Sequence, residues 1–295
     1  MDMMINKVIM FAIIIAVSFT ATKVGWLGEN VRDGLSRFII KVTAPLMIFS
    51  SIAGLEFKKS LLFEAGIILV MSFAIVFALI LLGRLYVKKS NLGEKTRGVQ
   101  VALMTFGNVA FIAYPLFEAV FGAVGVFYGA FYHLANDTTF WVLGVSEIEG
   151  QKGTKPVGMR LKNVMNPNSA AIALGVICFL FQVKFPPVIY DPLVGLGKTT
   201  VYLSLAFVGT AMAWVDLRNT LKKASIYAIV LVKMILAPAA AALILTKVFS
   251  FGLTVTAISA VVLQISMPCM ILVSIMANEL ERDYKYASEA VLPQR

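Results

Sequence analysis

Asp137 and His133 are the ionisable residues whose spacing most readily supports chemistry in this chain. They lie four positions apart, which places them on the same face of a helix. The surrounding stretch is apolar, and an ionised carboxylate that faces lipid costs at least about 2.5–3.5 kcal/mol, so we expect Asp137 to face the protein interior or a water-filled pocket. With Asn136, the pair could relay a proton or a cation. The alternatives are a structural ion pair of Asp137 with Lys41 or Lys233, and a packing role for His133.

Helix-disfavouring residues interrupt two long uncharged stretches. Gly107, Asn108 and Pro115 fall in the first stretch, and Met267 and Pro268 fall in the second. A break inside the hydrocarbon leaves backbone N–H and C=O groups without helical partners, at several kcal/mol each. It is therefore tolerated only within protein or beside a water-filled cavity. Because the freed groups and half-helix ends can hold a solute, the pattern predicts a transporter binding site.

A small carboxylate is the kind of solute that these groups suit. Half-helix N-termini carry positive partial charge and free N–H donors, and Asn108 adds amide donors without the cost of a buried charge. Lys41 or Lys233 could balance the charge of the anion, although a lysine near a helix end can instead snorkel to the membrane surface. We therefore expect a small organic anion, a mono- or dicarboxylate, as the partner.

The composition indicates a chain that resides in a lipid bilayer. Hydrophobic residues make up 59% of it and charged residues 14%, whereas a soluble domain has roughly 25% charged residues. Charge-free runs reach the ~20 residues that a helix needs to cross the hydrocarbon, and they lack the alternation of a membrane β-barrel. The sequence thus predicts an all-α membrane protein with nine spans, at Ile5–Lys23, Phe38–Leu55, Leu61–Val87, Val99–Ala119, Val124–Ser146, Pro167–Val183, Leu196–Val215, Leu221–Phe249 and Val255–Asn278. Residues 284–291 look like the first turns of a tenth span that stops short, so we expect a truncated or altered C-terminus.

The net charge of +10 encodes orientation. Lys and Arg concentrate in the loops of one side, and the loops of the opposite side carry only Lys7, Lys58, Lys59, Lys184, Lys198 and Lys247. Basic loops stay in the cytoplasm, so we expect a plasma (inner) membrane protein with its N-terminus on the extracytoplasmic side. The charge is then not a sign of a nucleic-acid partner.

The sequence offers little support for catalysis, cofactors or metals. It contains no nucleophile motif, phosphate-binding glycine loop or nucleotide signature. Cys178 and Cys269 lie in different apolar stretches without metal-type spacing, so neither a zinc site nor a disulfide is predicted. We expect a protein that is not an enzyme and holds no cofactor, and whose energy comes from a solute or ion gradient.

The basic loop from Glu147 to Lys162 divides the chain after five spans. Five is odd, so a second set of the same kind enters the membrane from the opposite face and forms an inverted repeat. We predict a first repeat at 1–150, a cytoplasmic linker at 151–166 and a second repeat at 167–295. The broken span is the fourth in each half, and this shared position supports the repeat more strongly than either break alone.

Short motifs in order along essentially the whole chain resemble the auxin efflux carrier family of membrane transporters. They are Ala44-Pro45-Leu46, Phe106-Gly107-Asn108-Val109, Tyr114-Pro115-Leu116, Asn166-Pro167-Asn168, Leu203-Ser204-Leu205-Ala206, Ser266-Met267-Pro268 and Ala277-Asn278. The resemblance implies ten helices in two inverted five-helix repeats, with broken fourth and ninth helices that cross. The short central loop resembles that of prokaryotic members.

The resemblance also implies a function. Members of the family carry organic anions, which are auxin in plants and malate, malonate and related carboxylates in bacteria. Spans one, two, six and seven would form a homodimer scaffold, and the remaining helices would carry the site across the membrane as an elevator. The residues that would line the substrate site are Pro45, Asn108, Val109, Pro115, Ser266 and Pro268.

Three other functions stay open on the sequence. A sodium-coupled organic anion symporter of the bile-acid type shares the crossed-helix plan, and it would need clustered oxygen ligands such as Asn108, Asn136, Asp137 and Ser266. A membrane-embedded enzyme would have to use His133 with Asp137. A channel is opposed by the scarcity of charge available to line a pore.

Overall fold

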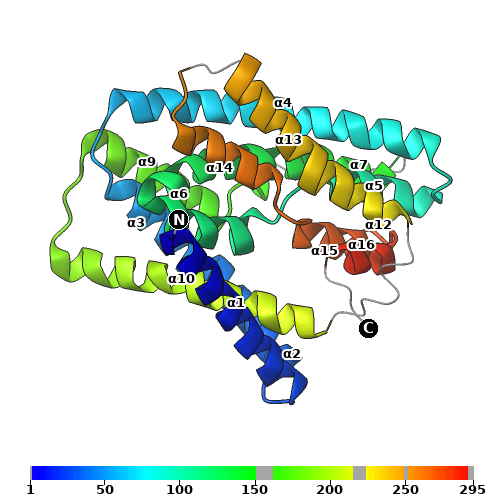
Figure 1. Cartoon of the computed structure of the whole chain (residues 1–295), viewed down its shortest axis with the longest axis horizontal. Coiled ribbons are helices and arrows are strands. Elements are labelled where there is room, and N and C mark those ends of the chain that lie inside the picture. The colour runs from blue at the N-terminus through cyan, green and yellow to red at the C-terminus, as the bar shows by residue number, and fades with distance from the viewer. Residues whose placement is uncertain (1, 151–161, 215–223, 249–251, 292–295) are drawn as a thin grey trace. The chain divides into compact units, whose positions relative to one another are not determined.

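Helices form the regular structure that the computed structural model describes, at residues 2–150, 162–214, 224–248 and 252–291 (Figure 1). The predicted all-α class is confirmed for these residues. The strand-like pairing within them is one isolated antiparallel bridge, between Gly107 and Cys269. The predicted cytoplasmic linker falls mostly outside the described residues, because positions 151–161 are not among them.

The chain packs as two units, each of which is described by itself. Unit 1 comprises residues 1–63, 110–130 and 166–215, and unit 2 comprises residues 64–109, 131–165 and 216–295. The helices of unit 1 are α1 (Asp2–Lys23), α2 (Glu29–Phe38), the π-helical η1 (Ile39–Thr43), α3 (Ala44–Ala53), α9 (Pro167–Phe181) and α10 (Pro187–Ala213). Those of unit 2 are most of α4 (Lys59–Lys89), α5 (Glu94–Thr105), η3 (Phe140–Gly144), α7 (Val145–Glu149), α12 (Ala224–Ile229), η5 (Val230–Leu236), α13 (Ala237–Leu243), η6 (Ile244–Val248), α14 (Val255–Ile265), α15 (Ile271–Glu279) and α16 (Tyr284–Val291). The π-helical η2 (Val109–Ala113) and α6 (Tyr114–Thr139) contribute to both.

Close backbone approach holds α10 against its neighbours in unit 1. Helix α1 crosses α10 (Figure 1), and a Cβ at Gly209 would lie 2.4 Å from the carbonyl oxygen of Ile15. A Cβ at Gly197 would lie 2.8 Å from the backbone of Met47 in α3. Only glycine permits these separations, so α10 packs backbone to backbone with α1 and α3.

Helix α10 continues through an internal proline. Pro192 has no N–H to donate to the carbonyl of Val188, yet the helix runs unbroken from Pro187 to Ala213. Val188 is 86% exposed and lies in the first turn of the helix, so the missing hydrogen bond falls at the exposed start of α10. The helix begins well before Leu196, the predicted start of this span, because proline at the first helical position favours helix initiation.

Three further prolines follow π-helical turns. Pro45, Pro115 and Pro238 are each the second residue of an α-helix, and the segments directly before these helices are η1, η2 and η5. In an α-helix the proline ring clashes with the carbonyl four residues earlier. The wider π turn bonds five residues apart and moves that carbonyl away. A π turn therefore lets the helix continue into the proline.

The turn between the predicted fourth and fifth spans lies inside α6. Gly122 has φ 62° and ψ −153°, a backbone conformation outside the helical region. Glycine adopts positive φ without steric cost, so it is suited to this sharp change of direction. The kink falls between Ala119 and Val124, the predicted end of span four and start of span five.

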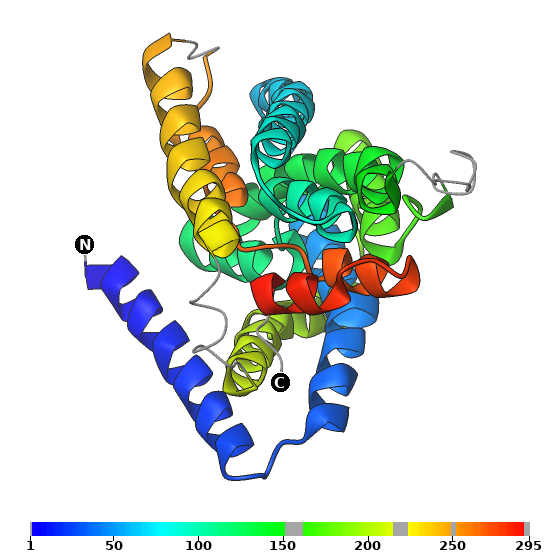
Figure 2. The same cartoon turned by 90° about the vertical axis from the view of Figure 1, so that its right-hand side faces the viewer.

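In unit 2, α13 lies beside α14 and α15 lies beside α16 (Figures 1 and 2). The hydroxyl of Thr254 accepts from the Ala257 N–H and caps the start of α14. The same hydroxyl donates to the buried carboxylate of Glu64 in α4 at 2.9 Å. This carboxylate therefore ties α4 to the beginning of the second broken span.

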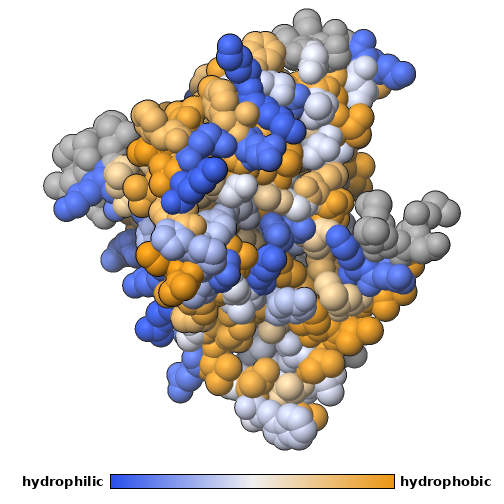
Figure 3. Space-filling view, turned by 90° about the vertical axis from the view of Figure 1, so that its left-hand side faces the viewer, coloured by the Kyte–Doolittle hydropathy of each residue, from blue (hydrophilic) through white to orange (hydrophobic). Residues whose placement is uncertain are grey.

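Exposed apolar side chains indicate surfaces that meet lipid. Helix α1 exposes Val8, Ile13 and Val17, and the face drawn in Figure 3 shows hydrophobic patches between hydrophilic residues. Six helical stretches of the described residues are long and apolar enough to cross a membrane, and α9 and α14 are shorter apolar helices. The described parts of all nine predicted spans are helical, with interruptions in the fourth and the ninth. These findings confirm a multi-pass membrane protein, and the inverted repeat stays a prediction.

Candidate functional site

The first predicted break lies at residues 106–108, in unit 2. Helix α5 ends at Thr105, and Phe106 has extended backbone with φ −89° and ψ 130°. Helical structure resumes at Val109. The break is narrower than predicted, because Pro115 lies in the helix that follows and the preceding π turn accommodates it.

The second predicted break lies at residues 266–270, also in unit 2. Helix α14 closes with the N–H of Ser266 donating to Val262 and the N–H of Met267 donating to Gln264. Met270 has extended backbone and precedes α15. As Pro268 cannot donate a backbone hydrogen bond, the helix cannot pass through this position with all its bonds intact.

The two breaks hydrogen-bond to each other. The N–H of Asn108 donates to the carbonyl of Pro268 at 2.7 Å, and the N–H of Met270 donates to the carbonyl of Phe106 at 3.1 Å. These reciprocal bonds are those of an antiparallel pair. Each break thus satisfies backbone groups that the other releases, and the broken fourth and ninth spans meet, as the resemblance implies.

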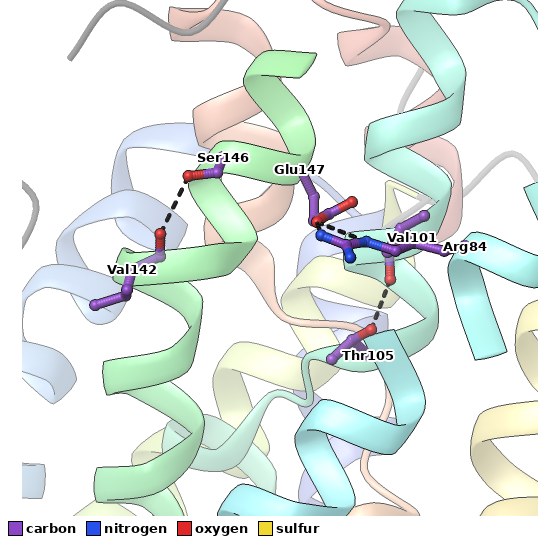
Figure 4. Close-up of polar contacts among 6 residues, drawn as sticks. All are labelled: Arg84, Val101, Thr105, Val142, Ser146 and Glu147. Carbon is purple, nitrogen blue, oxygen red and sulfur yellow. Dashed lines mark hydrogen bonds and ion pairs between the residues drawn. The ribbon is translucent and has the colours of Figure 1, made fainter. Parts of the chain in front are cut away.

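Lys233 brings a buried positive charge to the end of α5. It is 1% exposed, and its Nζ donates to the carbonyl of Thr105 at 2.8 Å. The hydroxyl of Thr105 donates to the Val101 carbonyl within α5 (Figure 4). The ammonium lies where the helix end carries negative partial charge, and two of its three hydrogens remain for other acceptors. A Cβ at Gly107 would lie 3.7 Å from this Nζ, so the charge borders the first break.

The ionisable pair lies in α6, one turn before a residue that contacts the first break. His133 Nε2 and Asp137 Oδ2 are 3.1 Å apart and both residues are buried, which confirms their predicted common face. One turn later, Phe140 packs edge-on against Phe106 with ring centroids 5.1 Å apart. Asn136 is fully buried, and neither its Nδ2 nor its Oδ1 has a hydrogen-bond partner among the described residues. This amide therefore has unused capacity to bind a ligand or water.

The other predicted charge partner, Lys41, and the predicted prolines Pro45 and Pro115 belong to unit 1, and the substrate role of these residues stays a prediction. Among the described residues, Lys233 pairs with no carboxylate, so the alternative ion pair between Lys233 and Asp137 is not found. Lys41 is exposed and belongs to unit 1, in η1. Pro45 and Pro115 are also in unit 1 and are buried.

The remaining predicted residues lie within the breaks or at their edges. Val109 is buried and begins η2. Ser266 is half-buried, and its hydroxyl donates to the carbonyl of Leu263 at 2.8 Å. Sequence reasoning did not identify Cys269, whose Sγ donates to the carbonyl of Leu103 at 3.4 Å. It also missed Thr105 as the partner of Lys233, because no local pattern encodes a contact between distant segments.

Backbone donors at the second break complete the site. No side chain caps the start of α15, and the N–H groups of Ile271 and Leu272 have no acceptor among the described residues. The first N–H groups of a helix have no internal partner and carry positive partial charge. These donors, the Lys233 ammonium and the Asn136 amide are chemically suited to an anion.

Comparison with known proteins supports the resemblance found in the sequence. An uncharacterized transporter of Methanothermobacter thermautotrophicus is 25% identical over 292 residues, which cover 97% of this chain and 92% of that protein. The family described as membrane transport protein matches residues 3–294. The chain therefore belongs to this family of membrane transporters, which includes the auxin efflux carriers.

Proposed function

We propose that the chain is a secondary active transporter that carries a small organic anion, a mono- or dicarboxylate, across the plasma membrane. Membership of a transporter family supports transport as the activity. The observation that carries the proposal is the pair of hydrogen-bonded helix breaks in unit 2. Broken helices in corresponding spans of the two halves are typical of substrate sites in secondary transporters.

The chemistry at the breaks favours an anion of modest size. Lys233 supplies one full positive charge, and the start of α15 supplies N–H donors. Carboxylates accept such hydrogen bonds and are favoured near helix N-termini. Asn108 and Asn136 would add amide donors that fix the orientation of the substrate.

His133 and Asp137 support coupling of transport to protons. A buried carboxylate in contact with an imidazole can take up and release a proton, and intramembrane ionisable groups frequently form such relays. The Asp137 carboxylate and the buried oxygen of Asn136 would also suit a sodium ion, which favours sodium-coupled symport as the second candidate. Uptake measured with and without sodium separates the two.

A membrane-embedded enzyme would use the same pair, His133 and Asp137, and would be detected by product formation in detergent.

The division into units supports an elevator mechanism. Helices α1, α3, α9 and α10, which include the predicted spans one, two, six and seven, belong to unit 1. The paired breaks belong to unit 2. We extend the proposal to a homodimer through these four spans, which mass photometry of the purified protein tests by a doubled mass.

The proposed orientation places the N-terminus outside the cytoplasm. Lys58 and Lys95 are both exposed. The distribution of basic residues among the loops predicts Lys58 outside the cytoplasm and Lys95 inside it. In separate single-cysteine variants, an impermeant thiol reagent added outside cells should label Lys58→Cys and spare Lys95→Cys. The reverse pattern would invert the topology.

Removal of the Asn108 amide tests the substrate site. Asn108→Ala should weaken carboxylate binding by about 0.5–3 kcal/mol, the effect of one lost hydrogen bond. A thermal-shift series with malate, malonate and monocarboxylates reports the affinity, because a ligand at a hundredfold excess over Kd stabilises by about 2.7 kcal/mol. Asn91→Ala is the matched control, since Asn91 is exposed in the loop before α5. Unaltered affinity of Asn108→Ala for every carboxylate would move the site elsewhere.

A further inference from the structure

Unit 2 contains a polar cavity that none of the residues of the helix breaks line. Its volume is about 580 Å³, within the range typical of small-molecule sites. It is lined by the ends of α4, α5 and α7 and by the segment before α16, and its charged residues are Arg84, Glu94, Arg97, Glu147 and Arg282. Three guanidinium groups from different segments of the chain thus face one cavity.

One arginine is neutralised within the cavity. Arg84 of α4 pairs with Glu147 of α7, with Nε to Oε1 at 3.0 Å (Figure 4). A Cβ at Gly98 would lie 1.8 Å from the carbonyl oxygen of Glu147, so α5 and α7 touch through their backbones here. The Arg84 and Glu147 pair and this contact form a fixed wall.

The other two arginines keep their charge available. Arg97 Nε donates to the carbonyl of Leu92 at 2.9 Å, and Arg282 donates to the carbonyl of Glu149. Among the side chains that the structure describes, no carboxylate pairs with either guanidinium. Each guanidinium has five N–H donors, so most of them remain for a ligand.

The start of α5 opens into the same cavity. Gly93 is its N-cap and offers no side-chain hydrogen bond, and Gly93 and Glu94 both line the cavity. An uncapped helix N-terminus presents N–H donors and positive partial charge, which favour phosphate. The planar guanidinium group of arginine can also donate two parallel hydrogen bonds to phosphate oxygens.

We propose that this cavity binds a phosphate-bearing anion through Arg97, Arg282 and the first turn of α5. Two sources share this chemistry. The headgroup of an anionic phospholipid is one, because Leu81 and Leu85 are exposed on α4 on either side of Arg84 and can contact acyl chains. A soluble phosphate compound is the other. The bound anion would join α4, α5, α7 and the start of α16 at their charged ends.

Binding to the purified full-length chain tests the proposal. For the soluble source, inorganic pyrophosphate is titrated by calorimetry in detergent. For the lipid source, nanodiscs of phosphatidylcholine with phosphatidylglycerol are analysed by native mass spectrometry for retained lipid. Arg97→Gln and Arg282→Gln should each weaken binding of the effective probe at least about tenfold, which corresponds to the loss of one charge-assisted hydrogen bond.

A matched control distinguishes a site from general surface charge. Arg37→Gln removes the same charge at an exposed position in the last turn of α2, in unit 1. The charge pattern predicts the same side of the membrane for Arg37 and Arg97, and Arg37→Gln should bind as the wild type does. Because Arg97 is exposed, Arg97→Gln should elute and melt like the wild type, so its binding loss is not a folding defect. Binding of neither probe by the wild type overturns the proposal, as does an equal loss in Arg37→Gln and Arg97→Gln.

Discussion

Helix α10 of unit 1 and the paired breaks of unit 2 contain the same residue types with different outcomes. In α10, Asp191, Pro192 and Lys198 are exposed, and the helix is continuous. In unit 2, Asp137 and Lys233 are buried, and α14 ends at Ile265, before Pro268. The missing hydrogen bond of α10 lies at the exposed start of the helix, whereas at the breaks backbone groups of one segment bond to those of the other.

The difference teaches that proline alone does not determine a break. Pro192 remains in an α-helix near its exposed start, and Pro115 remains in a helix because a π turn precedes it. At Pro268 the chain instead leaves the helix, and its backbone bonds to Asn108 and Phe106. A break forms where a second segment can accept the released groups.

The largest expected difference between the two regions concerns the carboxylates. Asp137→Asn should lower proton-coupled uptake about a hundredfold and abolish its pH dependence, because a positioned acid–base group contributes that much. Asp191→Asn should leave uptake within about twofold, since an exposed substitution of this kind has little effect. Uptake into proteoliposomes between pH 5 and pH 8 measures both. A full rate with the wild-type pH profile in Asp137→Asn would remove it from the coupling mechanism, and failure to assemble would indicate a structural role.

A smaller difference is expected for the lysines. Lys233→Gln retains a donor for Thr105 but removes the charge, so carboxylate affinity should fall by about 1.5–3 kcal/mol, the value of a hydrogen bond to a charged group. Lys198→Gln should bind as the wild type does. Calorimetric titration with the carboxylate that binds the wild type most tightly measures the affinity of both variants. Equal affinities in the two variants would place the anion away from Lys233.

The two proline substitutions should differ least in their effect on uptake, and they should also differ in their effect on the stability of the chain. Pro268→Ala permits α14 to extend towards α15, so the paired bonds weaken and uptake should fall about tenfold, or about 1.4 kcal/mol. Pro192→Ala restores a helical hydrogen bond and should stabilise the chain by up to about 3 kcal/mol without changing uptake. Thermal unfolding and uptake are measured on both. An increase in uptake for Pro268→Ala would show that the break is not required.

The sequence predicted those features that depend on local chemistry. Gly107, Asn108 and Pro268 disfavour helix, and both breaks occur where they lie. The four-residue spacing of His133 and Asp137 placed them on one face, as observed. The apolar runs predicted the spans, although the charges of α10 concealed its early start at Pro187.

Long-range features could not be predicted in this way. Nothing near Lys233 in the sequence indicates that Thr105 accepts its hydrogen bond, because the contact depends on how α5 and η5 pack. The arginine cavity likewise gathers Arg84, Arg97 and Arg282 from segments whose charges suggested only orientation. Such groupings arise from tertiary structure, which single-sequence patterns do not contain.

The hydrogen bonds between the two breaks constrain the order in which the protein can be completed. Asn108 enters the membrane early in synthesis, and Pro268 follows only after more than half of the chain has been added. Until then, backbone groups at the first break lack their final partners, and hydrocarbon cannot supply substitutes. Unit 2 therefore acquires its finished backbone pairing only after residues 268–270 have been synthesised, and contacts between segments so far apart in sequence form slowly.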